Sequence, residues 1–131
     1  MHDWKDSWNE TQKQEALALK GPIFIIGASG FIGANLFYSL KALRNDVYAC
    51  SRNPQKSWRL TDVDTRFLIN LDITDSEKVH ELINEYRPAT IFNLSAYGAY
   101  SRQTDAEKIH QTNYIGTLNL IKALSDIGCD A

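Results

Sequence analysis

The stretch Pro22–Asn35 (PIFIIGASGFIGAN) joins an apolar run to three glycines spaced three apart, Gly27, Gly30 and Gly33. The run Ile23–Ile26 has the continuous apolar character of a short strand that is buried on both faces. Beyond it the apolar residues recur at helical spacing, at Ile32, Leu36, Leu40 and Leu43. The stretch therefore predicts a strand, a glycine-rich turn and then a helix.

A glycine-rich turn in this place predicts a phosphate site, because a helix N-terminus presents unpaired N–H groups and a partial positive charge. Gly27 would permit the tight turn, Gly30 would leave no Cβ before a diphosphate, and Gly33 would bring helix and sheet together. The spacing GxxGxxG is one residue longer than the GxGxxG of many dinucleotide folds. No Lys-Ser/Thr pair follows, which argues against an ATP-type loop. The alternative is a turn that binds no ligand.

The rest of the chain repeats the order strand, then helix. Further strands are predicted at Val47–Cys50, Phe67–Ile69 and Thr90–Leu94, and residues 53–65 predict a loop with a short helix near Pro54. Such alternation implies parallel strands joined by right-handed crossovers. The predicted fold class is α/β, a Rossmann-like doubly wound parallel sheet that stops after the fourth strand–helix unit.

Two capping-box spacings predict where the later helices begin. Thr74–Glu77 would open a helix that stops before Pro88, and Thr104–Glu107 would open a long helix through Leu124. Gly128 would close this last helix.

The composition is that of an ordinary globular protein. The 131 residues favour one domain, and the net charge of −2 gives no reason to expect nucleic-acid binding or a polybasic membrane anchor. The chain has no apolar stretch of membrane-spanning length and no signal-peptide pattern. Cys50 and Cys129 lie far apart in the sequence and form no CxxC spacing, so we expect free thiols in a reducing compartment. We therefore expect a cytoplasmic protein that binds neither membrane nor nucleic acid.

Residues 1–20 are predicted to be an N-terminal extension to the main domain, residues 21–131. The extension is polar, with apolar side chains at Trp4, Trp8, Leu17 and Leu19. It predicts either a short helix laid on the domain or a loosely attached segment.

The end of the second predicted strand bears on which dinucleotide is bound. An acidic residue there accepts hydrogen bonds from a free ribose 2′-hydroxyl. This chain has Ser51 and then Arg52, which can instead hydrogen-bond a 2′-phosphate, and Lys56 could assist. One charge-assisted contact contributes about 1.5–3 kcal/mol, roughly a tenfold preference or more. The sequence therefore predicts NADP as the preferred cofactor, with NAD as the alternative.

Residues after the third and fourth strands complete the predicted site. Asp72 can accept a hydrogen bond from an adenine amino group while Ile73 packs on the ring, or Asp72 is simply a loop residue before a helix. The small side chains of Leu94–Ala96 would let a ribose lie against the edge of the sheet.

Four motifs in order, GASGFIG (27–33), LDI (71–73), IFNLSA (91–96) and NYIGTLN (113–119), resemble the extended short-chain dehydrogenase/reductases. The similarity is greatest to their NAD(P)-dependent nucleotide-sugar epimerase/dehydratase group. It implies the strand order 3-2-1-4. It also implies these cofactor contacts: Gly27, Ser29, Gly30, Phe31, Ile32, Ser51, Arg52, Asp72, Ile73, Leu94, Ser95 and Ala96. Gly33 belongs to the same turn. Tyr97 is expected either to face cofactor and substrate or to pack, and Asn113 matches the family's helix asparagine, for which we expect structural support rather than direct catalysis.

The chain departs from the family in its catalytic residues. The resemblance implies a Tyr-x-x-x-Lys pair after a fifth strand, yet none of the six tyrosines is followed four residues later by lysine. The chain ends at about the place where the fifth strand is expected. We therefore assign no catalytic residue, and we expect this truncated chain to be inactive alone. A nucleotide-sugar substrate would bind only to a full-length form.

No other catalytic or metal-binding set replaces the missing pair. His2, His80 and His110 are scattered, and no paired Cys/His ligands occur. The last predicted helix is apolar on several sides, so we expect a homo-oligomer formed through it. Three interpretations stay open: a fragment of an epimerase, dehydratase or reductase, a non-catalytic NADP(H)-binding module or redox sensor, and an atypical NADP-dependent reductase.

Overall fold

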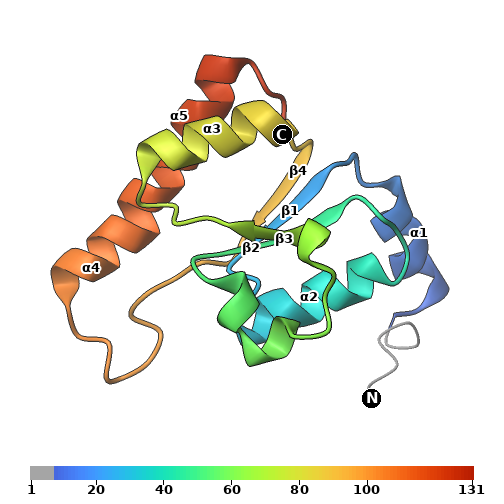
Figure 1. Ribbon diagram of the computed structural model, residues 1–131, viewed down its shortest axis with the longest axis horizontal. Coiled ribbons are helices and arrows are strands. Elements are labelled where there is room, and N and C mark those ends of the chain that lie inside the picture. Colours follow the sequence, from blue (N-terminus) through green and yellow to red (C-terminus); the bar gives the residue numbers. More distant parts are fainter. Residues whose placement is uncertain (1–7) are drawn as a thin grey trace.

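A four-stranded, all-parallel sheet forms the centre of the computed structural model, which describes residues 8–131 (Figure 1). The strands are β1 (Ile23–Ile26), β2 (Val47–Ser51), β3 (Leu68–Asn70) and β4 (Thr90–Asn93). Their order is β3-β2-β1-β4, as predicted. The third strand begins later than predicted because Thr65–Phe67 forms a 3₁₀ turn. The expectation about Trp4 lies outside the described residues.

Helices cover both faces of the sheet (Figure 1). On one face lie α2 (Phe31–Lys41) and α1 (Glu10–Ala18), and on the other α3 (Ser76–Tyr86) and α5 (Gly116–Ile127). Alternate residues of β1 serve two separate cores. Phe24 packs among α3 and α5, whereas Ile25 packs among α2, because successive side chains of a strand point to opposite faces. Burial on both faces explains why β1 is apolar throughout.

The helices after β3 and β4 begin one residue later than the capping-box spacings predict. The cap of α3 is Asp75, whose carboxylate accepts from the Lys78 amide (3.0 Å). The cap of α4 (Ala106–His110) is Asp105, which accepts from the Lys108 amide (3.0 Å). An N-cap carboxylate accepts from the amide three residues further on, as a threonine hydroxyl would at its own position, and it also interacts with the positive end of the helix dipole. The predicted caps Thr74 and Thr104 were therefore wrong.

The last predicted helix is interrupted rather than continuous. After α4, residues Gln111–Ile115 form a π-helical turn, and α5 continues to Gly128, which ends it in the left-handed conformation as predicted (φ 67°). Gly116 lies against Ile73, whose Cδ1 would be 2.5 Å from an added Cβ. Asn119 donates to the Ile73 carbonyl (2.9 Å). The NYIGTLN motif thus fixes this helix against the residues that follow β3.

Of the two expectations for the N-terminal extension, the structure shows the helix laid on the domain. Ala16 is buried, and Trp8 and Leu19 pack against the core beneath α2. Arg44 donates to the carbonyls of Ala16 (2.9 Å) and Leu19 (2.8 Å) and pairs with Asp46 (2.6 Å). This arginine therefore ties the extension to the end of α2.

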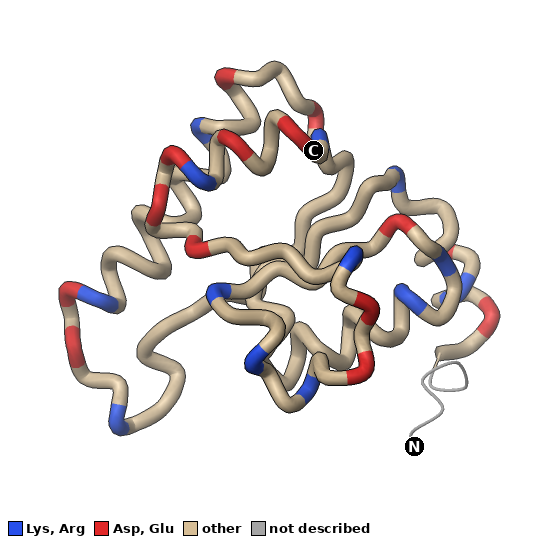
Figure 2. Tube along the Cα trace, in the orientation of Figure 1, with Lys and Arg blue, Asp and Glu red and all other residues tan. Residues whose placement is uncertain are grey.

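Charged residues of both signs are interspersed along the described trace (Figure 2). Within residues 8–131, no helix is long and apolar enough to cross a membrane.

Candidate functional site

A pocket of about 490 Å³ lies where the carboxyl ends of all four strands meet the start of α4. Most of the predicted site residues line it: Gly27, Ser29, Gly30, Ser51, Arg52, Asp72, Ile73, Leu94, Ser95, Ala96 and Tyr97. Phe31, Ile32, Gly33 and Asn113 do not line it. Ligands of open α/β sheets bind at this edge, beside the strand where the order reverses.

The glycine turn is shaped by close backbone approaches. Gly27 has a φ of 83°, and an added Cβ would lie 2.7 Å from the Leu94 carbonyl carbon and the Ser95 nitrogen. A Cβ on Gly33 would collide with the Gly27 carbonyl, so Gly33 brings the helix against the turn rather than against the sheet. A Cβ on Gly30 would meet only the Gly27 oxygen, at 3.3 Å. The space that a side chain at Gly30 would occupy is therefore part of the pocket.

The amides at the start of α2 are available to an anion. Gly30 is the N-cap and offers no side-chain cap, and within residues 8–131 the amides of Ser29, Phe31 and Ile32 have no protein acceptor. The side chains of Phe31 (70% exposed) and Ile32 (67%) are directed to solvent and leave the turn open. Several unpaired donors at a helix N-terminus form a binding site for phosphate.

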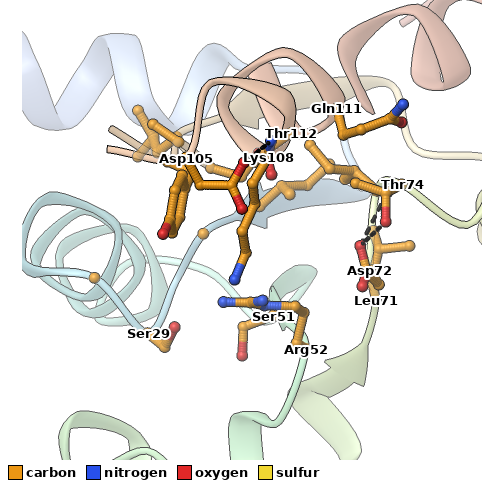
Figure 3. Close-up of a pocket in the computed structure, with 18 of the residues that line it drawn as sticks. Ser29, Ser51, Arg52, Leu71, Asp72, Thr74, Asp105, Lys108, Gln111 and Thr112 are labelled. Atoms are coloured by element: carbon orange, nitrogen blue, oxygen red, sulfur yellow. Dashed lines mark hydrogen bonds between the residues drawn. The ribbon is translucent and has the colours of Figure 1, made fainter. Parts of the chain in front are cut away.

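The end of β2 places an unsatisfied hydroxyl at the pocket. Ser51 is only 7% exposed, and its buried Oγ has no hydrogen-bond partner within residues 8–131. Leaving a buried hydroxyl unpaired costs about 1–3 kcal/mol. Arg52 follows on the same wall of the pocket and is exposed (Figure 3). The two residues that were predicted to choose the cofactor therefore line one site.

Asp72 has the structural role that one of its two alternatives predicted, and it also lines the pocket. Its Oδ1 accepts from the Thr74 amide (3.0 Å) and the Thr74 hydroxyl (2.7 Å), which fixes the loop before α3 (Figure 3). Its Oδ2 has no partner within the described part of the chain, and Asp72 lines the pocket. One oxygen is thus structural, and the other is open to a ligand.

The end of β4 is held by a network of side chains. Asn93 accepts from the Ser95 hydroxyl and donates to the Thr117 hydroxyl (3.3 Å). Asn113 accepts from the Tyr97 amide (2.9 Å) and donates to the Tyr97 carbonyl (2.8 Å). Both ends of the Asn113 amide are occupied in this way, so the residue supports the loop that carries Tyr97.

One wall of the pocket was missed by the sequence analysis. The start of α4 and the π-helical turn contribute Glu107 and the residues Asp105, Lys108, Gln111 and Thr112, which Figure 3 labels. Asp105, Lys108 and Thr112 are spaced three and four apart, so the sequence does place them on one helical face. What it lacks is any signal that this face turns back over the strand ends.

Burial affects the pKa of three titratable groups in the interior of the protein. Burial raises the pKa of the Tyr38 and Tyr86 hydroxyls above its ordinary value of 10.0, which makes them weaker acids, and neither lines the pocket. Burial likewise raises the pKa of the Cys50 thiol, so that it is not a nucleophile. Within residues 8–131 no cluster of His, Cys, Asp or Glu could hold a metal ion. The arrangement suits binding of an anionic nucleotide.

The fold and site define a Rossmann-like α/β protein. The sequence model of the NAD dependent epimerase/dehydratase family matches residues 23–131, and the chain belongs to that family.

Solved structures with the same fold come from several organisms. The epimerase Mth375 of Methanothermobacter thermautotrophicus shares 24% identity, with a TM-score of 0.72 over 91% of this chain and 36% of that one. The UDP-glucose 4-epimerase of Thermotoga maritima shares 23% identity, with a TM-score of 0.67 over 81% of this chain and 34% of that one. The enzyme WbmG of Bordetella bronchiseptica, solved with NAD and UDP, shares 21% identity, with a TM-score of 0.68 over 82% of this chain and 34% of that one. This chain therefore spans about a third of the length of the structures that it resembles.

Proposed function

We propose that this chain is the NAD(P)-binding portion of an epimerase/dehydratase-like enzyme. The observation that carries the proposal is the open glycine turn: Ser29 and Gly30 line a nucleotide-sized pocket, and within residues 8–131 the amides of Ser29, Phe31 and Ile32 have no protein acceptor. A nicotinamide cofactor bound there would supply hydride transfer. The residues present fit such a cofactor, because groups suited to its diphosphate, its adenosine and its second ribose lie along the strand ends.

The assignment of residues follows the order of the strands. The turn at Ser29–Phe31 would hold the diphosphate, and the ends of β2 and β3 would hold the adenosine, with Asp72 Oδ2 accepting from the adenine amino group. Leu94–Tyr97 would lie beside the nicotinamide ribose. The work of these residues is to bind and orient the dinucleotide, and we assign none of them a proton-transfer role.

The preferred cofactor is proposed to be NADP. Support comes from the unsatisfied hydroxyl of Ser51 and from Arg52 beside it, where a carboxylate would repel a 2′-phosphate. A contact of this kind contributes about 1.5–3 kcal/mol. The relatives WbmG and the Thermus thermophilus UDP-glucose 4-epimerase were solved with NAD, so a preference for NADP would distinguish this chain from them.

The proposed substrate class of the full-length enzyme is a nucleotide-linked sugar. UDP-glucose is bound in the Thermotoga maritima relative, which supports this class by analogy of fold alone. A second candidate is a non-catalytic NADP(H)-binding module or redox sensor, in which cofactor occupancy would alter a surface that a partner recognises. The sequence Ser51–Pro54 would also suit an atypical NADP-dependent reductase.

Exposed apolar side chains on the last helical segment support self-association. Tyr114 (60% exposed) and Ile121 (58%) lie on the last helical segment and leave apolar area uncovered. We propose that two copies of the chain associate through this surface. We also propose that the protein resides in the cytoplasm.

Calorimetric titration of the purified chain with NADPH and NADH tests the cofactor proposal. We expect saturable binding of NADPH, with weaker binding of NADH. Gly30→Ala should keep the fold, because the added Cβ meets only the Gly27 oxygen, and should lose binding because the methyl group enters the phosphate site. Gln55→Ala, at an exposed position outside the pocket, is the matched control. A folded wild-type chain that binds neither nucleotide would overturn the proposal.

A further inference from the structure

We propose that Lys108 is a phosphate-binding residue, which pairs with a phosphate group of the dinucleotide from the side of the pocket opposite Arg52. The inference rests on the proposed function and extends it to a wall of the pocket that no motif of the sequence identifies.

The backbone around Lys108 is fixed, while its side chain is available. Asp105 Oδ1 accepts from the Lys108 amide (3.0 Å), which sets the first turn of α4 over the strand ends. From this turn the Lys108 side chain extends into the pocket, toward the wall that carries Arg52 and Ser51 (Figure 3). A long, flexible side chain on a fixed turn can reach a ligand without movement of the backbone.

The Lys108 ammonium has no ionic partner within residues 8–131. Its Nζ lies 4.7 Å from the centroid of the Tyr97 ring, and no carboxylate lies within 4 Å of it. A ring face offers weak attraction at an exposed site and accepts no conventional hydrogen bond. A phosphate would offer both charge and acceptor oxygens, so the ammonium should leave the ring when a phosphate is bound.

The charge balance of the pocket gives this lysine particular weight. The lining carries the cations Arg52 and Lys108 and the carboxylates Asp72, Asp105 and Glu107. Those carboxylates repel a bound anion, and without Lys108 only Arg52 would oppose them. Loss of the lysine should therefore weaken anion binding more than loss of an ordinary surface lysine.

Two phosphates of the ligand could supply the partner, the diphosphate bridge or the 2′-phosphate of NADP. Both would form the same ion pair with the lysine, and titration with different ligands distinguishes the two phosphates. A diphosphate contact would contribute to NADH and NADPH binding equally. A 2′-phosphate contact would contribute to binding of NADPH and of 2′,5′-ADP, but not of NADH.

The test is calorimetric titration of wild type, Lys108→Gln and Lys108→Arg with NADPH, NADH and 2′,5′-ADP at low and high salt. Lys122→Gln, at an exposed position of α5 outside this pocket, is the control. We expect Lys108→Gln to weaken binding by about tenfold and to reduce its salt dependence. Lys108→Arg should keep most of the affinity, and the control should match wild type.

The outcomes separate this inference from the function on which it rests. If wild type binds no dinucleotide, the proposed function itself fails. If wild type binds and Lys108→Gln matches it for all three ligands at both salt concentrations, Lys108 holds no phosphate, and the proposed function stands without it. Thermal melting of each variant, expected to match wild type because Lys108 is exposed, ensures that a loss of affinity reports a lost contact.

Discussion

The side-chain amide of Asn113 pairs with both backbone polar groups of Tyr97, at 2.9 Å to its nitrogen and 2.8 Å to its oxygen. This pair of bonds resembles one rung of a β-ladder and joins the π-helical turn to the loop after β4. Tyr97 and Lys108 both line the pocket. The Asn113–Tyr97 contact therefore joins the helical wall of the pocket, which carries Lys108, to the loop after β4, which carries Tyr97.

Replacement of Asn113 should loosen this loop. Asn113→Asp keeps the acceptor for the Tyr97 amide but removes the donor to its carbonyl, at a cost of about 0.5–1.5 kcal/mol because the bond is exposed. We expect faster amide exchange at Tyr97 and weaker dinucleotide binding. Hydrogen-exchange mass spectrometry with titration checks both, and Asn84→Asp on the exposed face of α3 is the control. Unchanged exchange at Tyr97 would show that the loop is held by other contacts.

The glycines of the turn should separate stability from binding. Gly33→Ala places a methyl group against the Gly27 backbone and should lower the free energy of unfolding by roughly 1–3 kcal/mol. Gly30→Ala should change stability far less, because its Cβ meets only one atom at 3.3 Å. Denaturant unfolding of the two variants measures the difference. Equal stability of the two would contradict the close approach of α2 to the turn.

Ser51 and Arg52 should control the choice of dinucleotide. Arg52→Gln removes the cation expected beside a 2′-phosphate, so the affinity for NADPH should fall about tenfold while that for NADH changes little. Titration with both nucleotides gives the ratio, and Lys122→Gln, at an exposed position outside the pocket lining, serves as the control. A wild-type chain that binds NADH as tightly as NADPH would show that the preference is absent.

The sequence specified the sheet and the glycine turn because their signals are local. β1 is apolar throughout since both its faces are buried, and Gly27 marks the turn since its φ of 83° disfavours other residues. Asp75 and Asp105 were missed as caps because Thr74 and Thr104 also fit the capping pattern. Choosing between such neighbours depends on where the chain enters the helix, which a local pattern does not contain.

The wall formed by α4 could not be predicted for a different reason. Lys108 is an exposed, charged helical residue by pattern, and only the tertiary fold brings it over the strand ends. The π-helical turn at Gln111–Ile115 likewise has no composition signal of its own. Its position becomes intelligible only from the contacts of Asn113 with Tyr97 and of Gly116 with Ile73.

The link between Arg44 and Asp46 should make stability depend on acid pH. The hydrogen bond and charge of Arg44 hold the pKa of Asp46 below its ordinary value of 3.8, although partial burial opposes this. Because the pKa of Asp46 is lower in the folded state, its contribution to stability is fully present when the pH is above the unfolded-state pKa. That contribution is lost as the pH falls through the folded-state pKa. Asp46→Asn should therefore lower the melting temperature at pH 7, and the difference from wild type should shrink as the pH falls through the lowered folded-state pKa of Asp46.

Thermal melts of wild type and Asp46→Asn between pH 7 and pH 2.5 measure this convergence. Asp126→Asn, at an exposed aspartate, is the control and should follow wild type at every pH. A constant difference between Asp46→Asn and wild type across the range would contradict an ionic contribution from Asp46.

Self-association through the last helix should depend on Ile121. The side chain is 58% exposed on α5, and a charge there would have to be desolvated in any apolar contact between copies. We expect wild type to sediment as a concentration-dependent mixture of monomer and dimer, and Ile121→Glu to shift it toward monomer. Leu17→Glu, at an exposed leucine on α1 across the sheet from α5, is the matched control and should leave the distribution unchanged. A wild-type chain that stays monomeric at the highest concentration reached would remove the argument for an interface on this helix.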